Sequence, residues 1–299
     1  DAPQKCVRFK ELAFYGCGKN PFKRKERSLM EKNLTTGSVL KNVVSFSLPF
    51  LLSYFLQTLY GMADLFIIGQ YEGVASTTAV SVGSQIMHML TVMIVGLAMG
   101  TTVTIGRAVG AGDREKSAKG IGNTFTLFMG LSVVLTLLLF FLSGGIVSLV
   151  QTPEQAVDGT IKYLKVCFLG IPFITAYNII AAIYRGIGDS KSPMYFVTVA
   201  CAANIGLDYF FMGALKMGPV GAALGTTLSQ GISVVISLIF ILKKKTDLPI
   251  KRAHFRPDRE VMGEILRIGV PVTLQDGFIQ VAFMVVTVIA NRRGLTDAA

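Results

Sequence analysis

Long apolar stretches separated by short polar segments dominate the chain. Glycine and proline interrupt these stretches, which membrane helices tolerate because neighbouring helices satisfy the freed backbone groups. A helix needs about 20 mostly apolar residues to cross the hydrocarbon core of a membrane. The pattern predicts an all-α membrane protein with seven spans, at residues 43–69, 79–105, 121–143, 160–184, 194–214, 219–242 and 268–291.

The composition supports this prediction and argues against an enzyme. Only 16% of the residues are charged and 52% are apolar, whereas soluble domains carry about 25% charged residues. No nucleophile–base set stands out, and the GAGD stretch at 110–113 does not follow a strand as a phosphate-binding loop would. We therefore expect no catalytic residues and no cofactor. The cysteines lack metal-ligand spacing and are interpreted as small apolar residues: Cys6, Cys17, Cys167 and Cys201.

Basic residues are unevenly distributed between the two sides of the predicted spans. Of the 29 lysines and arginines, 24 lie before the first span or in the 2–3, 4–5 and 6–7 loops, and five lie on the other side. Because basic loops stay inside, we expect a multi-pass protein of a prokaryotic plasma membrane with a cytoplasmic N-terminus. The net charge of +11 then reflects topology, and no nucleic-acid partner is expected.

The chain also divides into unequal parts. Residues 1–29 are basic and precede a start-like Met30, so their place in the native protein is doubtful. Residues 46–69 align without gaps with 268–291, which places Pro49 opposite Pro271. Such repeats are common in secondary transporters. We therefore expect a six-helix N-terminal lobe at 30–242, a cytoplasmic inter-lobe loop at 243–267, and the start of a second lobe at 268–299 whose remainder is missing.

Two aspartates inside the predicted spans lie at matching depth. Asp64 in the first span and Asp208 in the fifth are each roughly 8–9 Å below the outer edge, at 1.5 Å per residue. Acids at membrane depth are costly, and such residues are functional by default. Other polar side chains share their helix faces or their depth. We expect one polar cluster of Asp64, Asp208, Asn204, Gln57, Tyr60, Tyr163 and Thr226.

The predicted cluster suits a small cation, because it combines two carboxylates with an amide and hydroxyl groups and has no basic partner. Carboxylate and amide oxygens can coordinate sodium. A buried acid beside a second acid can instead take up a proton, because burial and like charge disfavour the ionised form. Asp208 could alternatively serve only as a hydrogen-bond partner between helices. No other metal site is expected.

Three further residues carry weaker signals. Asp276 in the seventh span could line a central cavity or could simply join helices. Pro49 can bend the first span, because proline removes a backbone hydrogen bond. His254 lies in the basic 6–7 loop and is expected to be solvated.

Three segments resemble the multidrug and toxic compound extrusion (MATE) transporters. They are RGIGDSKSPMYFVTVACAANIGLDYFFMGALKMGPVGAALGTTLSQ (185–230), LYGMADLFIIGQYEG (59–73) and GRAVGAGDREKSAKG (106–120). The resemblance implies twelve spans in two six-helix lobes around a V-shaped cavity, with this chain ending after the seventh. The pattern is most similar to the branch of the DNA-damage-inducible efflux proteins. The resemblance to that branch implies that this protein holds its coupling ion at Asp64, Asn204, Asp208 and Gln57, and that Pro49 bends the first helix.

The resemblance predicts an antiporter, coupled to protons or sodium, that exports organic and mainly cationic compounds. Its partners would be the small-molecule substrate and membrane lipid, and a monomer is favoured. Two alternatives stay open. A flippase for lipid-linked sugars would need a basic central cavity, and these spans contain almost no interior lysine or arginine. A non-transporting membrane sensor or partner protein would function without Asp208.

Overall fold

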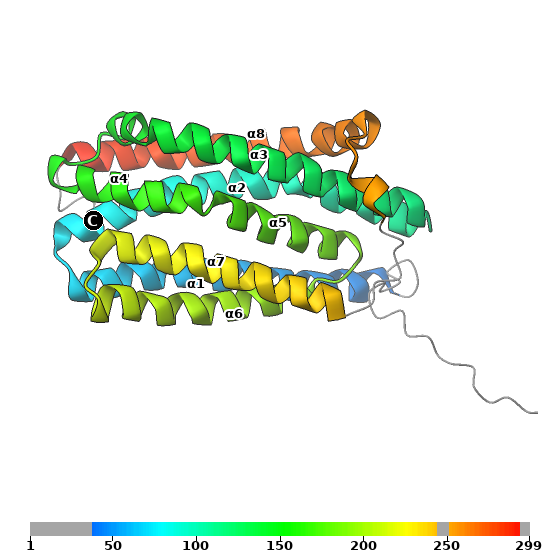
Figure 1. The fold of residues 1–299 in the computed structure, drawn as a ribbon, viewed down its shortest axis with the longest axis horizontal. Coiled ribbons are helices and arrows are strands. Elements are labelled where there is room, and N and C mark those ends of the chain that lie inside the picture. Colours follow the sequence, from blue (N-terminus) through cyan, green and yellow to red (C-terminus); the bar gives the residue numbers. More distant parts are fainter. Residues whose placement is uncertain (1–37, 244–250, 294–299) are drawn as a thin grey trace, which may run out of the picture.

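The computed structural model describes residues 38–243 and 251–293, and within these ranges every regular element is a helix. The helices run side by side as an elongated bundle (Figure 1). The predicted extension at 1–29 lies outside the described residues. The elements, in chain order, are α1 (Val39–Tyr71), α2 (Val74–Gly110), α3 (Arg114–Leu149), α4 (Glu154–Leu169), α5 (Ile171–Gly186), α6 (Lys191–Asp208), η1 (Tyr209–Ala214), α7 (Gly218–Lys243), η2 (Arg252–Phe255) and α8 (Arg259–Arg293).

The structure confirms the all-α membrane architecture. Within the described part of the chain, six continuous helical stretches are long and apolar enough to cross a membrane, and α4 with α5 makes a seventh if the pair is one span. Every helical stretch begins before its predicted span, and all but the fifth, which ends at Ala214 as predicted, also extend past its end. For example, α2 covers Val74–Gly110 where 79–105 was expected.

The fourth predicted span is not one straight helix. It bends by 49° between α4 and α5, around Gly170. Pro172 lies in the first turn of α5, where its missing N–H is tolerated. Gly170 also packs directly against α7, since an added Cβ would lie 2.7 Å from the Thr227 side chain. The bend therefore has two local causes, a proline that restarts the helix and a glycine that admits a neighbouring side chain.

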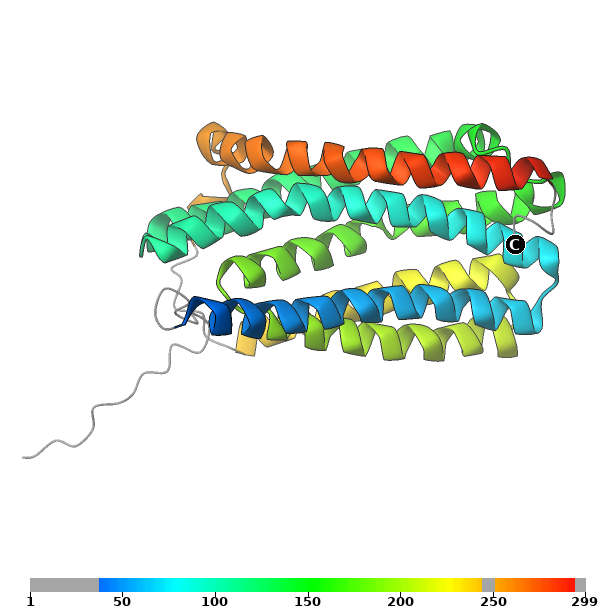
Figure 2. The same ribbon diagram turned by 180° about the vertical axis from the view of Figure 1, so that it is seen from behind.

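Figures 1 and 2 place α2, α3 and α8 on one side of the bundle and α1, α6 and α7 on the other. Helix α5 lies between these groups and contacts members of both. The start of α1, the 2–3 and 4–5 connections and η2 all lie at the same end of the bundle (Figure 1). These are the regions in which the basic residues concentrate, as the charge pattern predicted.

The most extensive contact between two helices in the described part of the chain joins α2 to α8. Gly100 of α2 lies directly against the backbone of Ile265, and Gly269 of α8 lies against the backbone of Leu97. A Cβ at either glycine would overlap a carbonyl oxygen of the facing helix. Small residues allow such close approach between membrane helices, so α8 is attached mainly through α2.

The connection into α8 is shorter than predicted. A loop was expected at 243–267, but η2 forms at Arg252–Phe255 and α8 begins at Arg259. His254 was expected to be solvated, and this was wrong because the residue is only 5% exposed. Its Nδ1 accepts the Lys251 backbone N–H at 3.2 Å, so Nε2 carries the hydrogen that reaches Glu115 Oε1 at 3.0 Å. The connection is therefore folded onto α3.

Candidate functional site: a buried acid cluster

The site is built around Asp64 of α1 and Asp208 of α6. Their side chains are 3% and 0% exposed, respectively, and their carboxyl groups are close enough to share a proton in a hydrogen bond. Asp64 and Asp208 are the only buried acids among the described residues. Two guanidinium nitrogens of Arg185 in α5, Nε and Nη2, are also buried and have no hydrogen-bond partner, but this group lies over the Phe50 ring, 5.2 Å from its centroid, and not against either acid. The two acids that residue counting places at matching depth therefore lie next to each other in the structure.

Hydrogen bonding leaves this pair incompletely satisfied. Thr226 Oγ1 of α7 donates to Asp64 Oδ2 at 3.0 Å, and the Asn204 side chain lies beside the Asp64 carboxyl. With both acids ionised, Asp64 Oδ1, both oxygens of Asp208 and both amide atoms of Asn204 are buried without a partner. Buried polar atoms without partners are costly. A proton or a small cation between the carboxyl groups would supply what these oxygens lack.

Close packing holds the Asp208 carboxyl in place. Asp208 is the last residue of α6, where the chain changes from α-helix to the π-helical turn η1. Its Oδ1 lies against Gly225 of α7, at a position that a Cβ on Gly225 would overlap. Single π-helical turns occur often at functional sites. Only glycine at residue 225 leaves room for the Asp208 carboxyl group where it lies.

Tyrosine hydroxyls extend the cluster to α2, α4 and α7. Tyr163 of α4 is 2% exposed, and its hydroxyl shares a 2.9 Å hydrogen bond with Ser84 of α2. The Tyr60 hydroxyl accepts a 3.3 Å hydrogen bond from Gln230 Nε2 of α7. Both predicted tyrosines therefore lie in the polar region around Asp64, where each is bonded to another side chain.

Three predicted residues lie outside the acid cluster itself. Gln57 faces Tyr177 of α5, and no hydrogen bond joins Gln57 to either acid. Asp276 lies on α8 against Gly96 of α2, whereas the acid pair belongs to α1 and α6. Pro49 lies within α1, where its carbonyl oxygen accepts the Ser53 hydroxyl at 2.8 Å.

Sequence reasoning missed Ser84, Gln230 and Gly225. Gln230 carried a usable signal, because it is four residues after Thr226 and thus on the same helix face. Ser84 and Gly225 carried none, since serine and glycine are common throughout these spans. Their importance depends on which helices become neighbours.

Comparison with known proteins places the chain among transporters. The MatE family model matches residues 49–210. A probable multidrug resistance protein of Bacillus subtilis, YpnP, is 33% identical over 88% of this chain and 58% of its own length. A probable multidrug resistance protein of Thermotoga maritima, NorM, is 30% identical over 80% of this chain and 52% of its own. The chain thus spans little more than half the length of these relatives.

Solved structures agree with the family model. A MATE crystal structure in a bent conformation superposes with a TM-score of 0.78 at 28% identity, and covers 88% of this chain and 58% of that protein. A multidrug resistance MATE transporter in an inward-facing conformation gives a TM-score of 0.75 at 28% identity, over 81% of this chain and 55% of that one. Since the family model covers more than half of the chain and the fold agrees, the chain belongs to the MatE family, the MATE multidrug efflux transporters.

Proposed function

We propose that this protein exports organic compounds across the plasma membrane in exchange for a cation that binds at Asp64 and Asp208. The observation that carries the proposal is the buried pair of acids with no buried base beside it. Two facing carboxyl groups are costly when both are ionised. Binding one cation offsets that cost, and releasing it restores the cost, so occupancy of the site can bias a conformational equilibrium.

The substrate class rests on the relatives, which are described as multidrug resistance proteins. An organic cation is the preferred cargo, because a negatively charged site cannot hold the coupling ion and a cationic substrate with equal strength at once. The basic end of the bundle would face the cytoplasm, so the acid pair would lie in the outer half of the membrane. This orientation would let the coupling ion enter from outside and favour release of the substrate there.

Both coupling ions remain compatible with these residues. A proton would join the two carboxyl groups. Sodium would use oxygens of Asp64 and Asp208, with the Asn204 amide oxygen as a further ligand, since this atom has no other partner. A lipid-linked sugar flippase is less favoured, because binding pyrophosphate would need several buried basic residues, and in the described part of the chain Arg185 alone has buried side-chain nitrogens of a basic residue without a partner.

The test is dye transport in proteoliposomes that contain the complete gene product. A fluorescent cationic dye is loaded, and a proton gradient or a sodium gradient is imposed in separate experiments. We expect one gradient to drive dye movement and Asp208→Asn to abolish it. Asp276→Asn is the matched comparison, because it removes a half-buried acid of α8 outside the cluster.

The outcomes separate the alternatives. Equal transport by Asp208→Asn and wild type would refute a coupling role for the acid pair, and would reduce Asp208 to a contact between helices. Loss of transport in Asp276→Asn as well would show that the acid pair is not the sole acidic requirement. Absence of dye movement under either gradient would contradict cation-coupled export of this substrate class.

A further inference from the structure

Arg185 carries a buried charge that the acid cluster does not explain. It lies in the last turn of α5, towards the basic end of the bundle, and its Nε and Nη2 are buried without a hydrogen-bond partner. No acid in the described part of the chain forms an ion pair with it. The Phe50 ring of α1, 5.2 Å from the guanidinium carbon, holds the group by a cation–π contact, which does not neutralise its charge.

This contact joins two helices that are otherwise apart. The backbones of α1 and α5 make almost no close contact with each other, and long side chains reach across the space between them. Gln57 of α1 faces Tyr177 of α5, and two turns further towards the basic end Phe50 faces Arg185. The two helices therefore meet through facing pairs of side chains.

One face of α1 connects the Arg185 contact to the acid pair. Residues three or four positions apart project from the same face of a helix. Phe50 and Asp64 are 14 residues apart in the sequence, which is about 21 Å at 1.5 Å per residue. The residues of α1 with this spacing are Phe50, Ser53, Gln57, Tyr60 and Asp64.

Polar groups of α5 and α7 lie along this face and link its two ends. Tyr60 is within electrostatic range of Asp64 and of Tyr177, and Tyr177 is within range of Arg185. Gln230 donates to the Tyr60 hydroxyl, while its own Oε1 is buried without a partner. We call the following set the polar column: Asp64, Thr226, Tyr60, Gln230, Gln57 and Tyr177.

The polar column offers a cation a route from the acid pair towards the basic end. Hydroxyl groups both donate and accept hydrogen bonds, so they can relay a proton. An ion that passes along this route alone would dissipate its gradient without moving a substrate. A fixed positive charge opposes that passage, because at about 6 Å and an effective dielectric constant of about 20 it lowers the occupancy of a monovalent cation roughly 100-fold.

We propose that Arg185 closes the polar column to cations and so prevents the ion at the acid pair from leaking towards the basic end. An arginine can form such an electrostatic barrier in a membrane pathway. Phe50 holds the guanidinium at the end of the column, and the lack of an acidic partner leaves its charge effective. The proposal rests on the proposed coupling site, but ion leak is measured without substrate, so the two can fail separately.

The experiment measures ion leak through the complete gene product in proteoliposomes without substrate. A proton gradient or a sodium gradient is imposed at a clamped membrane potential, and entry is followed with a pH-sensitive or a sodium-sensitive dye inside the vesicles. Arg185→Gln should raise the leak of the coupling ion roughly 100-fold. Arg185→Lys keeps the positive charge and should leak about as little as wild type.

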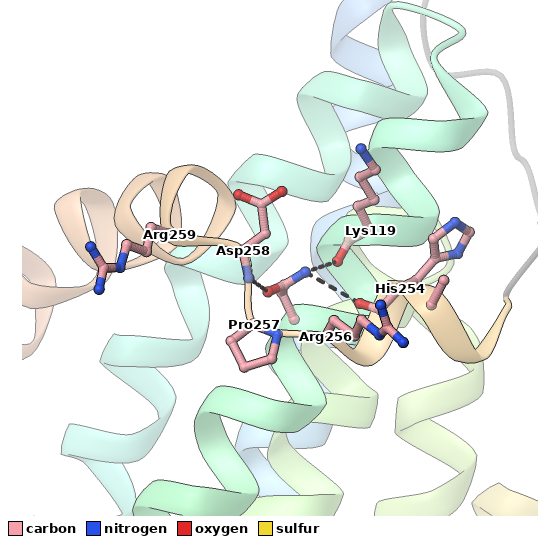
Figure 3. A pocket seen from close by; sticks show the side chains of 8 residues that line it. Lys119, His254, Arg256, Pro257, Asp258 and Arg259 are labelled. Carbon is pink, nitrogen blue, oxygen red and sulfur yellow. Dashed lines mark hydrogen bonds between the residues drawn. The ribbon is translucent and has the colours of Figure 1, made fainter.

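Arg256→Gln is the matched control, because it removes an exposed positive charge at the same end of the bundle, outside the polar column. Arg256 lines a pocket of about 430 Å³ between α3 and the start of α8 (Figure 3). The segment that carries it is fixed to α3, since the Asn123 side chain donates to the backbone oxygen of His254 at 3.2 Å and accepts the backbone N–H of Asp258 at 2.7 Å. Leak through this control should equal that of wild type.

A double variant tests whether the leak passes the acid pair. Asp208→Asn added to Arg185→Gln should bring the leak back towards the wild-type rate, because the ion loses its binding site at the start of the column. A leak that persists in the double variant would overturn the proposal by placing the path elsewhere. Equal leaks in Arg185→Gln and Arg185→Lys would also overturn it, since charge would then not be the barrier.

A wild-type rate of leak in Arg185→Gln would refute the barrier even if dye transport confirms the coupling site. If Arg185→Gln does not fold, Phe50→Leu keeps the charge and removes the ring that holds it. Leak should then rise about two- to fivefold, which corresponds to the strength of an ordinary cation–π contact. An unchanged leak in Phe50→Leu would count against the proposed position of the guanidinium.

Discussion

The hydrogen bond from Thr226 to Asp64 can reveal the charge on the acid pair. Thr226→Val keeps the shape of the side chain and removes the hydroxyl that donates to Asp64 Oδ2 at 3.0 Å. Hydrogen bonds between neutral groups of neighbouring membrane helices contribute about 0.6 kcal/mol on average. A hydrogen bond to an ionised group contributes about 1.5–3 kcal/mol. The two charge states of Asp64 therefore predict different costs for the same substitution.

The assay is equilibrium unfolding of the purified chain in mixed micelles with increasing dodecyl sulfate, followed by circular dichroism. Thr226→Val is compared in the wild-type and Asp64→Asn backgrounds, because asparagine still accepts the bond but carries no charge. If Asp64 is ionised, the cost should fall by about 1–2 kcal/mol in the asparagine background, which is the difference between a charged and a neutral hydrogen bond. If Asp64 carries a proton, the cost should be nearly the same in both.

The neighbouring Thr227 supplies the matched control. Its hydroxyl is buried and has no hydrogen-bond partner, so Thr227→Val should leave the free energy of unfolding unchanged or slightly raise it. If Thr226→Val changes the free energy of unfolding no more than Thr227→Val does, the reasoning is refuted, because the hydrogen bond to Asp64 would then contribute nothing.

Three further predictions use the same purified chain. Gly225→Ala should lower the free energy of unfolding by about 1–3 kcal/mol, because the added methyl group overpacks against the buried Asp208 of α6. Gly206 has open space around it, so Gly206→Ala should be neutral or stabilising in the same unfolding assay. Equal effects of the two substitutions would contradict the close packing at Gly225. Gly100→Ala should destabilise by a similar amount, because its Cβ would overlap a backbone carbonyl oxygen of α8; an unchanged unfolding midpoint would show that the two helices are not in contact there. Asn123→Ala should free the segment between α7 and α8, so that trypsin cleaves it faster than in wild type; identical cleavage rates would show that the two bonds to its backbone do not hold it.

The sequence could predict the acid pair because helix geometry relates residue number to depth. Asp64 and Asp208 are a similar number of residues from the same side of the membrane, and a constant rise per residue places them at one level. Counting residues along a helix does not show which residues of other helices will contact it. Ser84 and Gly225 matter only because α2 and α7 pass beside Tyr163 and Asp208.

Local departures from ideal helices were harder to predict. The 49° bend at Gly170 depends on contact with α7 as well as on Pro172. The burial of His254 depends on side-chain bonds from Glu115 and Asn123, more than a hundred residues earlier in the chain. The basic composition of the loop indicated that His254 would be exposed, because composition carries no information about contacts with residues so distant in sequence.

The π-helical turn after Asp208 also has a consequence for changes in chain length. An α turn closes between residues i and i+4 and a π turn between i and i+5, so η1 holds one residue more than a regular helix would. Deleting one residue within 209–214 could let the turn close as an α-helix, while Asp208 before it and α7 after it keep their directions. The same deletion within 200–207 would rotate Asp208 by about 100° about the helix axis relative to the preceding residues. The end of this span that carries η1 is therefore a place where evolution could add or remove a residue without turning the acid away from its partner.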